Sequence, residues 1–206
     1  MSEKKTGRFF TTFNLVLLGI FAAILLLLSF TPLGYLKIGI IEISFLAIPV
    51  AICACYLGKW GGLILGTIFG LTSFFQCLGY SVLGTALMGI NGFYTFIVCV
   101  VSRVLMGFLA GLIADAFRSE KPATRHIKYV VVSIATPVMN TLFFCGLLAL
   151  LFGKIPVTIG DMEINVITAV VVPAVTLNGI VEAVAGAIIG TAVCEAIYPL
   201  YRRARK

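Results

Sequence analysis

Residues 93–114 read FYTFIVCVVSRVLMGFLAGLIA, an apolar run that one charge interrupts at Arg103. The run is long enough to cross a lipid bilayer, which takes about 20 apolar residues in a helix. A charged side chain at that depth costs about 2.5 kcal/mol or more, so it normally faces a cavity, a partner or a ligand. The stretch therefore predicts a membrane helix with a polar site beside it.

The composition of the whole chain supports a membrane protein. Hydrophobic residues make up 61% of the sequence and charged residues 11%, against about 45–50% and about 25% in soluble domains. So large an apolar excess cannot all be buried in one water-soluble core of 206 residues. The net charge of +7 lies in short clusters beside apolar runs, which is a topology signal rather than an indication of a nucleic-acid partner.

The hydropathy pattern predicts a single membrane domain over residues 1–206, an all-α integral membrane protein with six transmembrane helices and both termini in the cytosol. The six predicted spans cover about residues 13–30, 38–57, 61–78, 92–117, 127–152 and 173–199. Two segments between spans on the outer side, 79–91 and 153–165, are rich in small or polar residues. Each of them is interpreted either as a movable lid or as a plain connector.

The distribution of lysine and arginine gives the orientation. With six spans, one side of the membrane carries two basic residues, Lys37 and Lys154. The other side carries twelve, namely Lys4, Lys5, Arg8, Lys59, Arg118, Lys121, Arg125, Lys128, Arg202, Arg203, Arg205 and Lys206. Because basic residues concentrate in cytosolic loops, the second side is predicted to be the cytosol. The predicted location is the cytoplasmic membrane of a prokaryote, crossed several times.

Polar side chains recur in the middle and outer parts of these spans. Asn178 and Glu182 are four residues apart, as are Thr72 and Gln76, so each pair shares one helix face. The candidate ligand-binding residues are Arg103, Asn140, Asn178, Glu182, Gln76, Thr72, Asn91 and Tyr94. Two interpretations of Arg103 stay open. It is held structurally, in an ion pair with Glu182 or by carbonyl groups of a broken helix, or its planar fork binds an acidic or carbonyl group of a ligand. The two interpretations are compatible if Glu182 orients Arg103 while a ligand supplies the remaining contacts.

Small residues mark helix faces that allow close packing. In the first span Gly19 and Ala23 have this spacing, with Ala22 beside them, which indicates internal packing or a docking face for another membrane subunit. Two further stripes are expected to pack against each other. They consist of Gly107, Ala110, Gly111 and Ala114 in the fourth span, and of Ala183, Ala187 and Thr191, with Gly186 and Gly190 beside them, in the sixth.

Motifs of catalysis are missing from the sequence. It has no P-loop, no H-E-x-x-H and no G-x-S-x-G. All six cysteines lie in apolar runs without metal-ligand spacing, so they are expected to be small buried hydrophobes, with no metal site. The sequence therefore predicts neither an enzyme nor catalytic residues nor a cofactor.

Six stretches together resemble a known family over nearly the whole chain. They are TPLGYL at 31–36, IPV at 48–50, GTIFGLTSFFQ at 66–76, SRVLMG at 102–107, MNT at 139–141 and NGIVEA at 178–183. In their order and spacing, the chain resembles the substrate-binding S components of energy-coupling factor (ECF) vitamin transporters.

The resemblance implies six helices and high-affinity binding of a water-soluble vitamin from outside. It also implies docking on a membrane coupling subunit that carries two cytosolic ABC-type ATPases, so that ATP is used by the partners only. The S component is thought to topple in the bilayer to release its cargo. A small-residue motif on the first helix, often A-x-x-x-A, commonly makes the contact. Here it matches Gly19, Ala22 and Ala23. Binding by the last three helices implies roles for Arg103, Asn140, Asn178 and Glu182.

The resemblance is nearest to the pantothenate-type branch. One arginine and two asparagines would satisfy the carboxylate, hydroxyl and amide groups of pantothenate. Riboflavin or another vitamin is the alternative within the family. Relatives often have Pro before the arginine, where this chain has Val101-Ser102-Arg103. From a different class, a stand-alone secondary transporter or facilitator is the rival interpretation.

Overall fold

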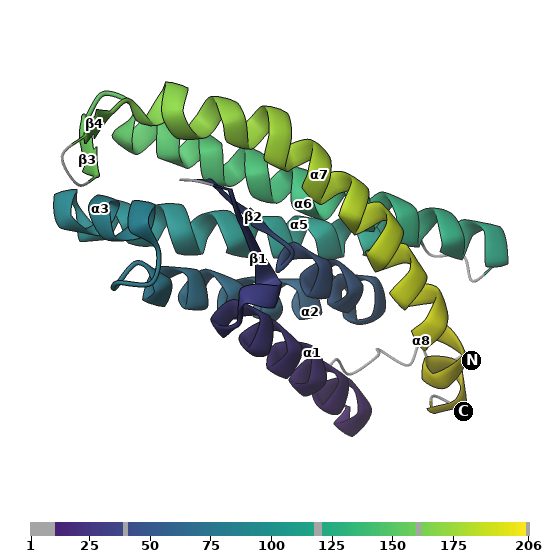
Figure 1. Ribbon diagram of the computed structural model, residues 1–206. Coiled ribbons are helices and arrows are strands. Elements are labelled where there is room, and N and C mark those ends of the chain that lie inside the picture. The colour runs from purple at the N-terminus through teal and green to yellow at the C-terminus, as the bar shows by residue number, and fades with distance from the viewer. Residues whose placement is uncertain (1–10, 39–40, 118–120, 160–161, 205–206) are drawn as a thin grey trace.

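The computed structural model describes residues 11–38, 41–117, 121–159 and 162–204. Over these residues the chain forms a helical bundle with two small antiparallel hairpins (Figure 1). The helices are α1 (Thr12–Phe30), α2 (Ala47–Gln76), α3 (Val82–Ile90), α4 (Gly92–Phe96), α5 (Ser102–Ala116), α6 (Pro122–Phe152), α7 (Gly179–Ala185) and α8 (Thr191–Ala204). The strands are β1 (Tyr35–Ile38), β2 (Ile41–Ser44), β3 (Val157–Ile159) and β4 (Met162–Ile164).

Four short π-helical segments interrupt the later helices, and one 3₁₀ turn, η1 (Pro32–Gly34), follows α1. The π segments are η2 (Ile97–Val101), η3 (Ile167–Val171), η4 (Ala174–Asn178) and η5 (Gly186–Gly190). Segment η2 joins α4 to α5, and the other three belong to one long helix that ends with α8. π segments widen the helix locally and often occur at functional sites.

Five helical stretches of the described chain are long and apolar enough to cross a membrane. They are Thr12–Phe30, Ala47–Gln76, Gly92–Ala116, Pro122–Phe152 and Ile167–Arg203. The second stretch is itself two helices, because the backbone of Gly58 has a non-helical conformation with φ 65° and ψ −156°. These stretches confirm the predicted helical membrane fold.

The break at Gly58 folds α2 back on itself. Eight residues of straight helix would rise about 12 Å, yet a Cβ on Gly62 would lie 3.4 Å from the Cβ of Ala54. Beyond the break, the backbone N–H of Lys59 donates to Asp115 Oδ2 at 3.1 Å, which caps the second limb. A Cβ on Gly58 would overlap the same carboxylate, so both its φ and its surroundings favour glycine.

The predicted second span is wrong at its N-terminal end. Residues 41–44 form strand β2, which pairs with β1 from Tyr35↔Ser44 to Ile38↔Ile41, and the helix begins only at Ala47. The sequence IEIS alternates apolar and polar residues, a period typical of a strand. The first limb of α2 then covers only about 16 Å of rise before Gly58, which is less than the thickness of the hydrocarbon core.

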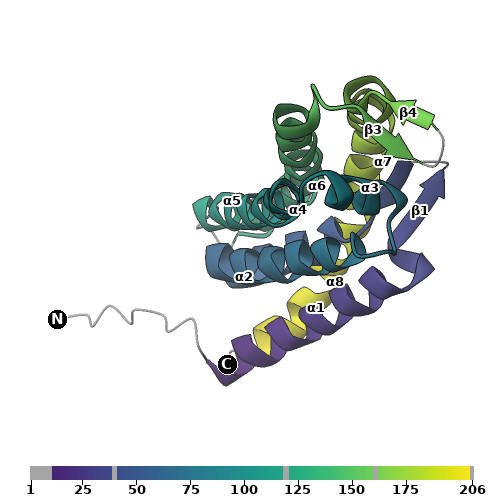
Figure 2. The ribbon, with the colours of Figure 1, turned by 90° about the vertical axis from the view of Figure 1, so that its left-hand side faces the viewer.

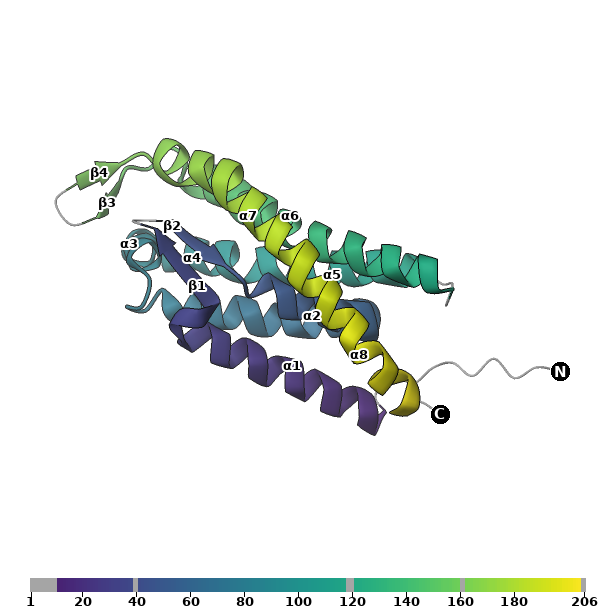
Figure 3. The same cartoon turned by 45° about the vertical axis from the view of Figure 1, so that its right-hand side comes forward.

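The two outer segments also carry regular structure. Within 79–91 the chain forms α3, whose N-cap Ser81 accepts a hydrogen bond from the N–H of Gly84 at 3.3 Å. Within 153–165 it forms the hairpin of β3 and β4. The start of α1 and the end of α8 lie at one end of the bundle, while α3, β3 and β4 lie at the other (Figure 3). Lys4, Lys5, Arg8, Arg118, Arg205 and Lys206 from the orientation argument lie outside the described residues.

Glycines bring the second limb of α2 and the α4–α5 helix into backbone contact. A Cβ on Gly62 would overlap the carbonyl group of Gly107, and a Cβ on Gly107 would overlap that of Gly62. A Cβ on Gly66 would overlap the carbonyl group of Arg103, and one on Gly70 would lie 2.8 Å from the Cα of Val100. Small residues permit this approach, and the contact fixes where Arg103 sits.

The expected contact between the two small-residue stripes is therefore wrong. Gly107 and Gly111 pack against α2, and Gly186 and Gly190 pack against Ser133 of α6. Small residues indicate that a helix has a close neighbour, but they do not say which helix it is. The six cysteines are all buried and free, as expected.

We expect Gly107→Ala to destabilise the protein by about 1–3 kcal/mol, since the added methyl meets backbone that cannot move aside alone. The measurement is thermal unfolding in detergent. Gly146→Ala is the matched control, because a Cβ there meets nothing within 4 Å. It should leave stability unchanged or slightly higher. Equal melting temperatures for the two variants would contradict the close contact of α2 and α5.

Candidate functional site

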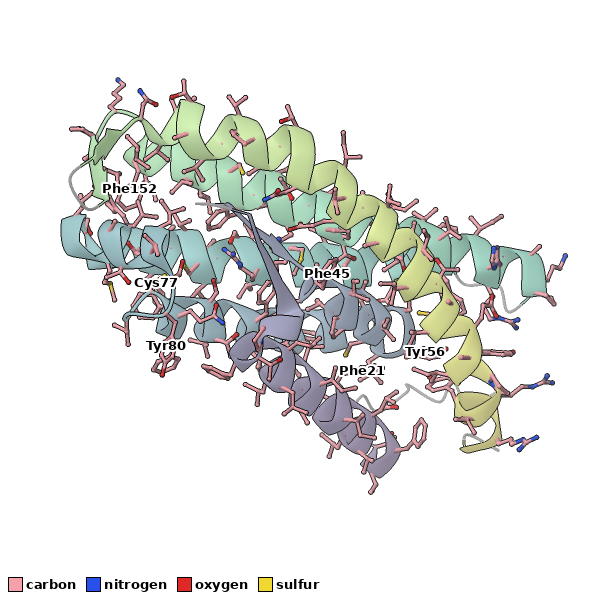
Figure 4. The ribbon with its side chains drawn as sticks, in the orientation of Figure 1. Phe21, Phe45, Tyr56, Cys77, Tyr80 and Phe152 are labelled. Atoms are coloured by element: carbon pink, nitrogen blue, oxygen red, sulfur yellow. The ribbon has the colours of Figure 1, made fainter. Side chains whose placement is uncertain are left out.

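A cavity of about 130 Å³ lies between α2, α5, α6 and the last helix, toward the end of the bundle where α3 lies. Its polar lining residues are Ser44, Ser73, Gln76, Cys77, Ser81, Cys99, Arg103, Asn140, Thr141, Cys145, Asn178 and Glu182. Its apolar lining comes from Phe69, Leu83, Gly84, Leu87, Phe144, Val170 and Ala174. Figure 4 shows Cys77 in this half of the bundle, far from Tyr56, which lies beside α8.

Arg103 enters the cavity from the first turn of α5, directly after the π segment η2. Its side chain is buried, with 8% of the residue surface exposed. One guanidinium nitrogen, Nη1, donates to the carbonyl of Val98 at 3.1 Å and to Ser102 Oγ at 3.0 Å. The guanidinium also lies 4.4 Å from the ring centre of Phe144 and 5.3 Å from that of Phe69. These contacts hold the charge in place without neutralising it.

Glu182 enters the same cavity from α7 and is 5% exposed. Its Oε1 accepts from the backbone N–H of Ser44 at 2.8 Å, and its Oε2 accepts from Thr141 Oγ at 3.3 Å. The carboxylate therefore ties the β1–β2 hairpin and α6 to the last helix. Its hydrogen-bond partners, which also include the side chain of Asn140, are neutral, and Arg103 acts on this carboxylate only through space.

Arg103 and Glu182 do not pair with each other. The ion pairs with N···O within 4.0 Å that the described residues form do not include this pair. The predicted ion pair of Arg103 with Glu182 is therefore wrong, whereas the other structural alternative, a bond to a helix carbonyl, agrees with the contact to Val98. Two opposite charges instead line one hollow, each held by separate neutral groups.

The amide side chains complete the polar wall. Asn140 on α6 and Asn178 on η4 are buried and line the cavity. Gln76 also lines it, and its amide nitrogen donates to the carbonyl of Ser29 at the end of α1. Among the described residues, two buried polar atoms of this wall lack a hydrogen-bond partner, Arg103 Nε and Asn140 Oδ1. Buried polar atoms normally find a partner, so a bound molecule is a natural candidate to supply one.

Three of the eight predicted ligand-binding residues lie outside this lining. Thr72 donates to the carbonyl of Phe69 at 2.9 Å, and its hydroxyl lies 3.4 Å from that of Ser29. Asn91 caps α4, where its Oδ1 accepts from the N–H groups of Phe93 and Tyr94 at 3.1 Å each. The ring of Tyr94 packs edge-on against Phe152. All three side chains have structural roles in the helices that carry the site.

Several lining residues were not among the predicted ones. Phe144 lies four residues after Asn140, Cys99 four before Arg103, and Ser73 three before Gln76, so helical periodicity around the predicted residues could have found them. Thr141 follows Asn140 directly. Ser44 had no comparable signal, because it reaches the cavity only through the β1–β2 hairpin.

The lining offers groups that can bind a polar molecule. It offers a cation, an anion, amide and hydroxyl groups, and two aromatic rings. Within the part of the chain that the structure describes, no group of three or more His, Cys, Asp or Glu residues could hold a metal ion. A polar molecule with both acceptor and donor groups would match this set.

The predicted docking residues lie on α1, which runs along the edge of the bundle (Figure 2). Gly19 and Ala23 are exposed, a Cβ on Gly19 would meet nothing within 4 Å, and Ala22 is half-buried against the core. The large side chains of Leu15, Val16 and Leu27 are also exposed on this helix. In the membrane this face is free to meet lipid or another subunit.

Comparison with protein families identifies the chain's family. The family described as the substrate-specific component of ECF transporters matches residues 13–194, which is most of the chain. None of the curated proteins compared with the chain matches it. The matched residues include every polar group of the cavity.

We expect Glu182→Ala to loosen the β1–β2 hairpin, because the N–H of Ser44 loses a charged acceptor worth about 1.5–3 kcal/mol. Hydrogen exchange followed by mass spectrometry should show about tenfold faster exchange at Ser44. Glu182→Gln keeps an acceptor oxygen and should have a smaller effect. Unchanged exchange in Glu182→Ala would show that this carboxylate does not hold the hairpin.

Proposed function

Because the chain belongs to the family of substrate-specific components of ECF transporters, we propose that it binds a small water-soluble vitamin for import, with pantothenate as its substrate. The observation that carries the proposal is the pair of opposite charges in one cavity. Arg103 and Glu182 both line the hollow and do not pair. Uncompensated buried charge is costly, so a ligand that meets both groups would stabilise the site.

Pantothenate fits this arrangement group by group. Its carboxylate would accept from the guanidinium of Arg103, whose Nε has no partner among the described residues. Its hydroxyl and amide N–H groups would donate to Glu182 and to Asn140 Oδ1, which also lacks a partner there. Asn178 and Gln76 would bind the remaining polar groups. In each contact a donor of one molecule meets an acceptor of the other.

Riboflavin is the alternative, and Phe69 and Phe144 favour it because they could line an aromatic slot. Both rings already contact the guanidinium of Arg103. A ligand at this wall of the cavity would therefore meet the cation as well as the rings. Riboflavin has no carboxylate to meet this cation. The lining therefore favours pantothenate.

The direction of binding follows from the predicted topology. The cavity is lined in part by α3, which lies at the end of the bundle opposite to the start of α1 and the end of α8 (Figure 3). Arg202 and Arg203 end α8, and Lys121 precedes α6, at the predicted cytosolic end. With the termini in the cytosol of a prokaryotic cell, the cavity would take its ligand from outside.

Transport would require partner subunits. The exposed face of α1 around Gly19 and Ala23 would dock on a membrane coupling subunit, and two ABC-type ATPases attached to it would hydrolyse ATP. No cofactor of the chain itself enters the proposal. A stand-alone facilitator would instead transport its substrate in cells that lack the ATPase module.

We expect Arg103→Ala to weaken pantothenate binding by more than about tenfold, since a charged hydrogen bond contributes about 1.5–3 kcal/mol. The measurement is isothermal titration calorimetry on purified protein, together with mass spectrometry of any molecule that co-purifies. Arg125→Ala is the control, because Arg125 binds Glu195 and Tyr198 away from the cavity. Wild-type affinity in a folded Arg103→Ala protein would remove Arg103 from the site, and a different co-purified vitamin would replace pantothenate.

We expect Gly19→Leu to reduce uptake in cells that contain the ATPase module, while the purified protein binds its vitamin as before. The bulky side chain would separate two packed helices, at a cost of about 1–3 kcal/mol to docking. Gly146→Leu adds the same side chain at another exposed helical glycine with open space and should leave uptake unchanged. Equal uptake by the two variants would contradict docking through this face.

A further inference from the structure

Two thiols meet in the wall of the cavity. The sulfur atoms of Cys77 and Cys99 lie 3.6 Å apart. Cys77 directly follows the second limb of α2, and Cys99 lies in η2, so the pair joins two different helices. Both residues line the cavity, and they are 5% and 4% exposed. Molecules would reach them through the cavity.

No other cysteine combines these two features in the part of the chain that the structure describes. Cys145 lines the cavity, but no thiol contact involves it. Cys55 and Cys194 interact with each other, but neither lines the cavity. Proximity and access together therefore single out Cys77 and Cys99.

The pair is coupled to Arg103 through one peptide group. The carbonyl of Val98, the residue before Cys99, accepts from Arg103 Nη1 at 3.1 Å and also from the hydroxyl of Ser102. A shift of the Cys99 backbone would move this carbonyl, which is the group that orients the guanidinium. The backbone here is π-helical, a conformation that is less regular than an α-helix and adjusts more readily.

We propose that Cys77 and Cys99 form a redox-sensitive pair, which small disulfides from outside the cell oxidise to a disulfide that weakens ligand binding. One thiolate attacks the small disulfide, RSSR, and displaces one RSH, which leaves a mixed disulfide on the protein. The second thiolate attacks the protein sulfur of the mixed disulfide, which forms the Cys77–Cys99 bond and displaces the second RSH. The protein loses two electrons and two protons, and RSSR is reduced to two RSH.

The change in geometry explains the effect on binding. A disulfide requires the two sulfur atoms at about 2.05 Å, so they must approach each other by roughly 1.5 Å from their present separation. Side-chain rotation and a shift of η2 would supply this movement. The shift would carry the Val98 carbonyl away from its present position and turn Arg103. Because oxidising conditions prevail outside the cytosol, a cavity open to that side would expose the pair to oxidants.

The effect on binding rests on the proposed function, but the formation of the disulfide does not. The test uses the purified full chain in detergent, with 2-hydroxyethyl disulfide as the oxidant. Mass spectrometry should show the loss of two hydrogens, and proteolysis should give one linked product that contains Cys77 and Cys99. Cys77→Ser and Cys99→Ser should each abolish this product. Cys145→Ser is the matched control, which lines the same cavity and should keep the product.

Pantothenate and riboflavin are then titrated into the reduced and the oxidised protein. Whichever of them the reduced protein binds should bind at least about fivefold more weakly after oxidation, which corresponds to about 1 kcal/mol, and added thiol should restore its affinity. A folded wild-type protein without the Cys77–Cys99 link would overturn the proposal, as would a linked protein with unchanged affinity. A protein that forms the link on oxidation, but in its reduced form binds neither vitamin, would instead contradict the proposed substrates.

Discussion

The backbone contact between the second limb of α2 and the α4–α5 helix is the constraint on which the site depends. Gly62, Gly66 and Gly70 face Gly107, the carbonyl group of Arg103 and Val100 at distances that a side chain would not allow. In lipid, helices gain little from the hydrophobic effect on meeting one another, so close packing of small residues has to supply the attraction. This contact sets the height and rotation of α5, and so determines which way the Arg103 side chain faces.

With Arg103 fixed, the rest of the cavity forms around a separation of charge. The guanidinium is held by Val98, Ser102 and two phenylalanine rings, while Glu182 is held by Ser44 and Thr141. Each charge has neutral partners that fix its direction and leave it able to interact further. Such preorganisation lowers the cost of ligand binding, because few side chains need to be ordered when the ligand arrives. The hydrogen bonds to neutral groups also explain how Arg103 and Glu182 can both be buried without forming an ion pair.

The sequence predicted five of the cavity residues, namely Arg103, Asn140, Asn178, Glu182 and Gln76, because a polar side chain in an apolar span is conspicuous. It did not separate them from Thr72, Asn91 and Tyr94, which are equally conspicuous but serve their own helices. Thr72 bonds the preceding turn, and Asn91 caps α4. A polar residue inside a span therefore indicates that some partner exists. Whether this partner is a neighbouring backbone group or a cavity depends on the rotation of the helix.

The sequence by itself determined the membrane class, most of the helical spans and the family, since hydropathy and motif order are properties of single segments. Only the tertiary structure decided that β1 and β2 replace the start of a span, and that Arg103 and Glu182 face one hollow without touching. It also decided that Cys77 meets Cys99. These features depend on how helices distant in the chain are rotated and pressed together. The physical reason is that packing depends on how two helix surfaces fit each other, and the sequence of one helix describes only one of these surfaces.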